Sequence, residues 1–392
     1  MALTGQIFPP GVSASAGGSS GGSPSTNDFR LTLSSGNPVY SPQPATPSST
    51  DTTNMTVTFS ADPGWTNGTI ATVSATVGGL TAGTIYYIRR RSSTLYSFHT
   101  SVAGAEGDTS KVTLSANITS EVRPSGVSST SIKLSPYRGN SLGLYSSGSW
   151  SNLTSAEISL ALGTLTSGTN YDVFAYNNSG AIAIELGPAW TNNTTRATAL
   201  ASQDGILVKS GDAARRFMGT LRADSTTTTI VDAGGLASQI GGKCLVWNDA
   251  NRVSLQLIVY DGAASWTYNV ATVRQANGAA GNKVEFVIGL AEDVIDVSIV
   301  YTVQAVSSGD NNGVGVDSTT AYRYDCLYSQ IVTPSGISSG GTTRWTGKLV
   351  AGYHYLAWLE FSGGAAGIYY GRNNPGSAAS SSFDGLTATV MA

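Results

Sequence analysis

Side chains that could act as a base, a nucleophile or a metal ligand are scarce in this sequence. It contains two histidines, His99 and His354, and two cysteines, Cys244 and Cys326. Both histidines lie in segments where aromatic residues alternate with others, as in a β-strand, so each is expected to be packed in a sheet. With so few of these residues, no histidine–cysteine zinc site is predicted unless subunits share it. No HExxH, P-loop or paired CxxC motif occurs.

The carboxylates do not exclude a glycosidase, because such an enzyme needs only two Asp or Glu side chains across a groove. The densest acidic cluster is Glu292-Asp293 with Asp296. At strand spacing Glu292 and Asp296 would share one face, so a solvated sheet edge or turn is the preferred interpretation. Residues 310–317 superficially resemble a calcium loop but lack the ligand pattern of an EF-hand, and a hairpin turn is predicted there. The sequence thus predicts no enzyme, no cofactor and no metal.

Exposed aromatic rings on the loops of a β fold could bind sugars by stacking. The candidates near Gly-, Ser- and Asn-rich segments are Trp150, Trp190, Trp345, Tyr369 and Tyr370. Each is equally a candidate core residue, because core packing accounts for most tryptophans in such folds.

The composition favours strands over helices. Charged residues make up 11% of the 392, well under the quarter or so that is typical, and Ser, Thr, Asn and 47 glycines supply the polarity. Helices would lack Glu, Lys and Arg, whereas strands and turns are well provided with Thr, Val, Tyr and Gly. We therefore predict an all-β protein, in which only residues 213–219 and 236–240 offer a turn of helix.

The charge and hydropathy patterns argue against two classes of partner. A net charge of −3 gives no general attraction for nucleic acid, and the basic run Arg89-Arg90-Arg91 is interpreted as a solvated strand end. No apolar run approaches the roughly 18 residues that span a bilayer, so no membrane insertion is expected. The N-terminus lacks the features of a signal peptide. The two cysteines are interpreted as separate buried thiols, although their contact stays open.

Changes in composition divide the chain into segments. Residues 1–28 combine an apolar group with a Gly/Ser-rich tether, which suits an extended arm that docks onto a partner; a disordered tail is the alternative. The anchoring side chains would be Leu3, Ile7, Phe8, Pro9 and Pro10. Residues 29–53 form a strand and a Pro/Ser/Thr-rich connector. A small β module is predicted at 54–121, a hairpin-rich domain at 122–204, and an antiparallel, jelly-roll-like β-sandwich at 205–392.

Two phrases of the form Leu-x-x-Gly-Thr-x-Tyr, at residues 80–86 and 165–171, have the pattern of a sandwich corner. The glycine makes the bend, and the tyrosine packs its ring inward while its hydroxyl bonds the backbone upstream. After the second phrase the residues alternate, with Tyr171, Val173 and Ala175 sharing one face of a strand. The turn residues at 177–180 then predict a hairpin.

Several phrases that occur in order resemble virion structural and tail-fibre proteins of tailed bacteriophages. They are LSPYRGN (134–140), the segment 165–222, WNDANRV (247–253), WTY (266–268), RQANG (274–278), VDSTTA (316–321) and HYLAWLE (354–360). Another phrase, LTAGTIYYI (80–88), resembles a small β module that recurs in phage appendages. The resemblance covers roughly residues 130–361, with the module near 54–121.

This resemblance implies a tail-fibre or spike subunit on the surface of a phage particle. Residues 1–28 would attach it to another virion protein, such as a tail adaptor, nozzle or capsid protein, and the chain would form a homotrimer that contacts a host glycan or protein. In the relatives the strand at 29–33 runs almost directly into 134–140, which would make residues 37–125 an insertion. The alternatives are a capsid decoration or head-fibre protein and a polysaccharide-degrading tailspike, although no regular coil repeat is visible.

Overall fold

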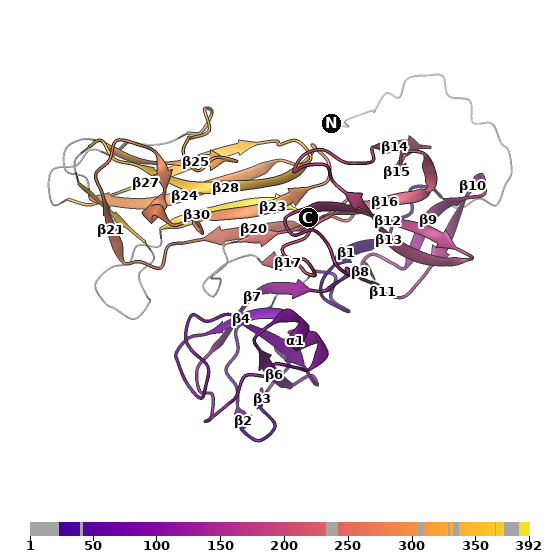
Figure 1. Cartoon of the computed structure of the whole chain (residues 1–392), viewed down its shortest axis with the longest axis horizontal. Coiled ribbons are helices and arrows are strands. Elements are labelled where there is room, and N and C mark those ends of the chain that lie inside the picture. Colours follow the sequence, from indigo (N-terminus) through magenta and orange to yellow (C-terminus); the bar gives the residue numbers. More distant parts are fainter. Residues whose placement is uncertain are drawn as a thin grey trace, which may run out of the picture.

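The chain is built almost entirely of β-strands, which confirms the predicted fold class. The computed structural model shows an elongated body of packed sheets with one smaller unit standing out from it (Figure 1). It describes residues 23–39, 42–232, 242–304, 309–327, 330–331, 337–364, 366–371 and 384–392. The predicted anchoring side chains lie outside these residues: Leu3, Ile7, Phe8, Pro9 and Pro10.

One part of the body surrounds a core to which the first strand belongs. β1 (Phe29–Thr32) pairs with β8 (Ser131–Pro136), which pairs with β11 (Ile158–Ala161). The hairpin of β9 (Ser141–Ser146) and β10 (Ser149–Thr154) adds to this part. A further sheet has the order β13-β12-β16-β15-β14, with β19 paired to β16. Its strands are β12 (Asn170–Asn178), β13 (Ala181–Ala189), β14 (Leu200–Gln203), β15 (Ile206–Lys209), β16 (Asp212–Arg222) and β19 (Val246–Asn248).

This last sheet is a layer shared by two cores. Val173 and Ala175 on β12 face the first-strand core, as alternation predicts, whereas Phe174 belongs to the core of the C-terminal sandwich. On β16, Met218 likewise faces the first-strand core, whereas Phe217 belongs to the core of the C-terminal sandwich. The domain boundary predicted after residue 204 is therefore wrong, because β16 beyond it pairs directly with β12.

The small module (residues 42–122) has a core of its own. Its helix α1 (Val102–Gly107) is the one α-helix of the described residues, and the Ser101 hydroxyl caps it by accepting from the Gly104 amide. Its strands are β2 (Ser49–Asp51), β3 (Thr56–Thr58), β4 (Thr69–Val73), β5 (Tyr86–Arg90) and β6 (Leu95–His99). The chain returns to the body through β7 (Val122–Ser129), so the module has the topology of an insertion between the paired strands β1 and β8.

The sheet of the small module continues into the body. β4 pairs with β7, β7 with β17 (Thr229–Asp232), and β17 with β18 (Lys243–Cys244). β18 then pairs, in parallel, with β23 (Lys283–Ile288) of the sandwich. Backbone hydrogen bonds thus link the module to the C-terminal sandwich across the middle of the molecule (Figure 1).

The C-terminal sandwich encloses the largest core between two sheets. One sheet contains β23, β22 (Arg274–Gln275), β25 (Asp310–Val316), β26 (Gln330–Ile331) and β28 (Gly352–Phe361). A 3-10 turn, Ala276–Gly278, follows β22. The facing sheet contains β20 (Ser254–Val259), β21 (Ser265–Tyr268), β24 (Ile295–Gln304), β27 (Ser339–Gly347), β29 (Gly367–Tyr370) and β30 (Gly385–Met391).

Both predicted sandwich corners are present. The Tyr86 hydroxyl accepts from the Thr81 amide at 2.8 Å, and the Tyr171 hydroxyl accepts from the Thr166 amide at 2.9 Å. Both tyrosine rings are buried. The glycine of each phrase has a positive φ, 76° and 69°, which a residue with a Cβ adopts only at a cost.

Other local predictions are wrong. Residues 213–219, proposed as a helical turn, lie inside β16, because alternate side chains there are buried in two cores. Residues 310–317, predicted to form a hairpin turn, lie almost entirely in β25. The other possible helical turn, 236–240, lies outside the described residues.

Candidate functional site

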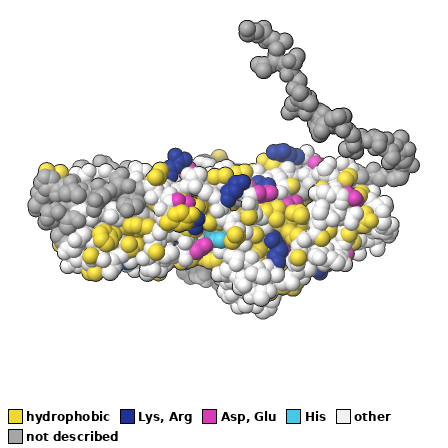
Figure 2. Space-filling model, turned by 90° about the horizontal axis from the view of Figure 1, so that it is seen from above, with side chains coloured by type: hydrophobic (Ala, Val, Ile, Leu, Met, Phe, Trp, Pro, Cys, Tyr) yellow, Lys and Arg dark blue, Asp and Glu magenta, His cyan; other side chains and the backbone are white. Residues whose placement is uncertain are grey.

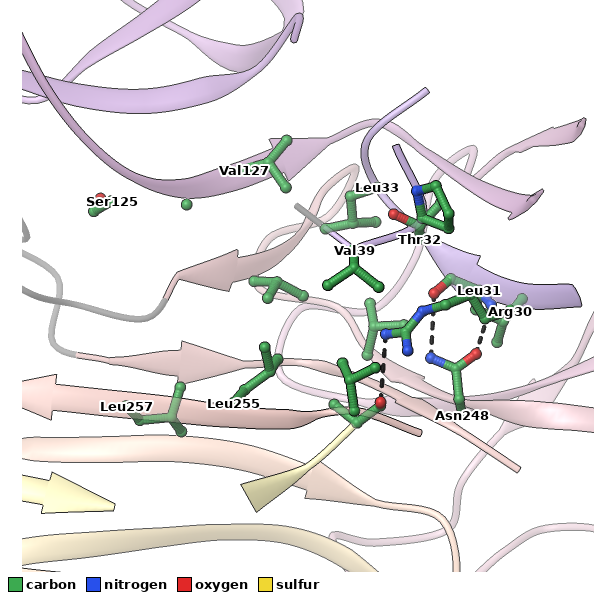
Figure 3. A pocket seen from close by; sticks show the side chains of 16 residues that line it. Arg30, Leu31, Thr32, Leu33, Val39, Ser125, Val127, Asn248, Leu255 and Leu257 are labelled. Atoms are coloured by element: carbon green, nitrogen blue, oxygen red, sulfur yellow. Dashed lines mark hydrogen bonds between the residues drawn. The ribbon is translucent and has the colours of Figure 1, made fainter. Parts of the chain in front are cut away.

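The first strand, the strand β7 that returns from the small module, and the C-terminal sandwich meet at one place in the body. A cavity of about 70 Å³ lies there between β1, β7, β17, β19 and β20 (Figure 3). Its walls are mainly apolar: Leu31, Leu33, Val39, Val127, Val231, Val246, Leu255 and Leu257. Ligand pockets are usually several hundred Å³, so this space is far too small for a sugar or a cofactor. We interpret it as a small void where these strands pack against one another, and we call this place the joint.

Two asparagines cover the free edge of β1 at this joint. The Leu31 amide donates to Asn248 Oδ1 at 2.5 Å, and Asn248 Nδ2 donates to the Leu31 carbonyl at 3.2 Å (Figure 3). Asn251 Nδ2 donates to the carbonyls of Asn27 and Phe29, both at 2.9 Å. Side-chain amides therefore stand in for a neighbouring strand and satisfy backbone groups that would otherwise be buried without partners.

Arg30 ties the same strand to the last residues of the chain. Its Nη1 donates to the Asn251 carbonyl at 2.7 Å and its Nη2 to the Ala392 carbonyl at 3.3 Å. Burial lowers the pKa of the guanidinium. A buried cation without a carboxylate partner is costly, so its carbonyl acceptors must hold it in place.

Arg216 fixes the residues that precede β1. It is 3% exposed, and its Nη1 donates to the carbonyls of Pro24 at 2.9 Å, Thr26 at 2.9 Å and Gly143 at 2.7 Å. Burial lowers its pKa to about 10, so it stays charged at neutral pH. The Gly143 amide also donates to the Thr26 carbonyl at 2.9 Å. Residues 23–28 are therefore part of the body, and the predicted limit of the arm at residue 28 is wrong because Arg216, remote in sequence, binds them.

The acidic cluster is divided between two arginines. Glu292 and Asp293 both pair with Arg252, at 2.5 and 2.8 Å, and Asp293 also accepts from the buried Trp247 indole at 3.0 Å. Asp296 pairs with Arg344 at 2.8 Å, and this bond lowers the pKa of the carboxyl. None of these carboxylates is paired with another across a groove, so the cluster holds the structure together.

Both histidines are buried and hydrogen-bonded, as predicted. His99 Nε2 lies 2.9 Å from the Ser97 hydroxyl and its Nδ1 2.5 Å from the Thr109 carbonyl, and burial lowers its pKa. His354 Nδ1 lies 2.7 Å from Asp317 and its Nε2 2.8 Å from the Val350 carbonyl. Each imidazole is held between neighbours within its own fold unit.

The arginine run ends β5, as predicted, but its side chains are paired. Arg90 binds Asp62 at 2.5 Å, and Arg91 binds Asp108. Arg89 donates to the carbonyls of Ala105 and Glu106 at the end of α1. The run therefore ties strands and helix of the small module together.

Most aromatic candidates for sugar binding lie in the core. Trp345 and Tyr369 are 2% and 1% exposed, so their assignment as surface contacts is wrong. Their positions on β27 and β29 face the sandwich interior, where Tyr369 donates to the Phe361 carbonyl at 2.6 Å. Trp190 is also buried. Trp150 and Tyr370 are half-buried and keep part of their rings at the surface.

The sandwich also buries a carboxyl that the sequence did not single out. Glu360 accepts from Trp266 Nε1 at 2.6 Å, from Arg274 Nε at 2.7 Å and from the Asn277 amide at 3.1 Å. Burial raises its pKa to about 7, against the effect of the three donors. Alternation along residues 353–361 places Glu360 on the inward face with Trp358, but no sequence signal identifies its partners.

Within the described ranges, no group of three or more His, Cys, Asp or Glu side chains could hold a metal ion. Cys244 and Cys326 are free, buried thiols. No helix among the described residues is long and apolar enough to cross a membrane.

Comparisons with known proteins identify no family for this chain. No protein-family model matches the chain, and no curated protein matches it. Among solved structures, the chain is similar to a tryptic core variant of Cry1Da from Bacillus thuringiensis, with 7% identity and a TM-score of 0.18. The similarity covers 66% of this chain and 47% of that chain, so the matched part is about half the length of the relative. A TM-score this low carries no argument about fold or function.

Proposed function

We propose that this chain is a structural subunit of a tailed-bacteriophage particle, part of a tail fibre or spike. Residues 1–22 attach it to another virion protein, three copies associate, and the β units face the host surface. The observation that carries the proposal is the use of polar side chains at the joint. Asn248, Asn251, Arg30 and Arg216 all bind backbone, and the cavity that Arg30 and Asn248 line is too small for a substrate.

The binding of residues 23–28 supports an attachment role for the residues before them. Arg216 holds Pro24 and Thr26 against β9, so the first described residues have a fixed place on the body. A subunit that hangs from a particle by one end needs such a connection, because load on the attached segment must pass into the fold through many bonds at once. The joint provides it, since β1 is bonded to β8 on one edge and to Asn248 and Asn251 on the other.

The surface supports an adhesive rather than a catalytic role. On the face shown in Figure 2, charged side chains form small separate groups among uncharged polar and hydrophobic atoms. No continuous basic surface for nucleic acid is visible on that face. Contacts from such a surface are individually weak, and several copies on one appendage would multiply them into avidity.

Quantification of purified particles tests the proposal. We expect the protein to be present at far fewer copies than the major capsid protein, and antibodies against the small module to label the tail. Absence from particles would overturn the proposal. Copy numbers comparable to the capsid protein, with label over the shell, would favour a decoration protein instead. Cleavage of host capsule or lipopolysaccharide by the purified chain would favour a tailspike hydrolase.

A further inference from the structure

The β9–β10 hairpin carries an aromatic pair at its tip. Tyr145 and Trp150 are directly opposite each other in the strand register, and their rings lie 5.4 Å apart at 62°. The connecting residues, Ser147 and Gly148, both have positive φ, as in a tight two-residue hairpin turn. Both aromatic side chains are half-buried, in contrast to the fully buried Trp345. The pair is thus held on a short, well-defined turn and remains partly open to solvent.

A second hairpin, formed by β14 and β15 and remote in sequence, forms a hydrogen bond with this pair. Trp150 Nε1 donates to Asp204 Oδ2 at 2.8 Å, and Gln203 Nε2 donates to the same oxygen at 2.9 Å. Asp204 and Gly205 form the β14–β15 turn, again with positive φ. The bond from the indole fixes the orientation of the Trp150 ring, because the ring can no longer rotate without losing it.

The polar groups beside the ring are suited to hydroxyls. The hydrogen bonds from Trp150 and Gln203 lower the pKa of Asp204, which is therefore a carboxylate at neutral pH. Among the described residues both of its side-chain bonds arrive at Oδ2, which leaves Oδ1 to accept from a ligand. The Gln203 carbonyl oxygen lies on the same side chain as the bonded amide and offers a second acceptor.

We propose that Tyr145, Trp150, Gln203 and Asp204 form a binding platform for a neutral saccharide. The apolar face of a sugar ring stacks on Trp150, and two neighbouring hydroxyls donate to Asp204 and Gln203. The negative charge of Asp204 disfavours uronic and sialic acids, because a second carboxylate beside it would be repelled. This inference names the ligand class for the proposed host contact and rests on that function for its biological meaning, but not for the binding itself.

Saturation-transfer NMR with the purified full chain tests the platform. The probes are neutral oligosaccharides ending in glucose, galactose or mannose, with a glucuronate-terminated oligosaccharide for comparison. We expect transfer to at least one neutral probe and none to the acidic one. Trp150→Ala should abolish it, and Asp204→Ala should weaken binding at least about tenfold. The matched control is Tyr324→Ala, which removes an aromatic ring that is 87% exposed elsewhere and should leave binding unchanged.

Three outcomes overturn the inference: no transfer to any neutral probe, transfer that survives Trp150→Ala, or transfer that Tyr324→Ala removes equally. Unchanged thermal unfolding of each variant shows that a lost signal is not lost folding. Saccharide binding by a protein that is absent from phage particles would refute the proposed function and leave the platform standing. If the protein is found in phage particles but binds no neutral saccharide, the platform is refuted and the proposed function stands.

Discussion

Arg216 Nη1 lies 2.7 Å from the carbonyl oxygen of Gly143, where the segment before β1 runs antiparallel to β9. A Cβ on Gly143 would lie 2.5 Å from the Ser23 carbonyl oxygen and 3.2 Å from that of Pro24. The arginine therefore binds the segment, and the glycine leaves room for it. Together they fix the position of residues 23–26 on β9.

Gly143→Ala should displace residues 23–26, because the added methyl group meets backbone rather than a flexible side chain. We expect protease cleavage near residues 23–28 to accelerate and the free energy of unfolding to fall by about 1–3 kcal/mol. Limited proteolysis followed by mass spectrometry measures the cleavage. The control is Gly281→Ala, where a Cβ meets nothing within 4 Å. Equal cleavage of the two variants would show that the segment does not depend on this close approach.

Asn248→Ala should remove the side chain that pairs with both backbone groups of Leu31. The buried Leu31 amide is then left without an acceptor, so we expect a loss of about 2–3 kcal/mol in the free energy of unfolding. Urea denaturation measures this loss. Asn178→Ala, at the exposed end of β12, is the control and should change stability little. A similar small change for Asn248 would mean that its two bonds to Leu31 contribute little to holding β1.

Tyr171→Phe and Tyr86→Phe should each cost about 1–2 kcal/mol, because the Thr166 or Thr81 amide loses its acceptor while the ring stays in place. Chemical denaturation of both variants measures the effect. Tyr176→Phe serves as the control, since Tyr176 lies on the opposite face of β12 from Tyr171 and is half-buried. If neither variant lowered the free energy of unfolding, the hydroxyls would have no structural role in the corners.

Glu360 should make the sandwich less stable as pH rises. Burial raises its pKa from 4.5 to about 7, so the folded state keeps a proton that the unfolded chain releases. Its contribution is complete below about pH 4.5 and is lost as pH rises through about 7, with a size of up to about 3 kcal/mol. Asp384, whose pKa burial raises to about 6, acts in the same direction, whereas His99, whose pKa is lowered, acts in the opposite one.

The pH effect of Glu360 is isolated by subtraction. The unfolding free energy of the parent chain is compared with that of Glu360→Gln from pH 4.5 to 7. The stability of the parent relative to the variant should fall as pH rises. A difference that does not change with pH would show that the three donors to Glu360 keep its pKa near the ordinary value.

Local patterns in the sequence predicted part of the local structure. Alternation placed Val173 and Ala175 on one face of β12, and the Gly-Thr-x-Tyr phrases predicted both corners with their hydroxyl bonds. Such features depend on residues within a few positions of one another, so the sequence contains them directly.

Features that depend on distant partners could not be predicted. β25 contains Asn and Gly, which favour turns, yet Asn312 is buried where it accepts from the Trp358 indole at 2.6 Å. Gly313 is needed there because a Cβ would meet the Tyr322 ring at 2.3 Å. In the same way, nothing near Trp150 in sequence indicates that Asp204 would bind it. Tertiary neighbours decided these positions, and local propensity did not.

Deletion of residues 2–22 separates attachment from folding. The deletion must stop before Ser23, because residues 23–28 bind Arg216 and β9 and belong to the body. We expect the shortened chain to unfold at the same denaturant concentration as the full chain, and particles produced with it to lack the protein. Particles that carry the shortened chain at full occupancy would contradict attachment through the N-terminal residues.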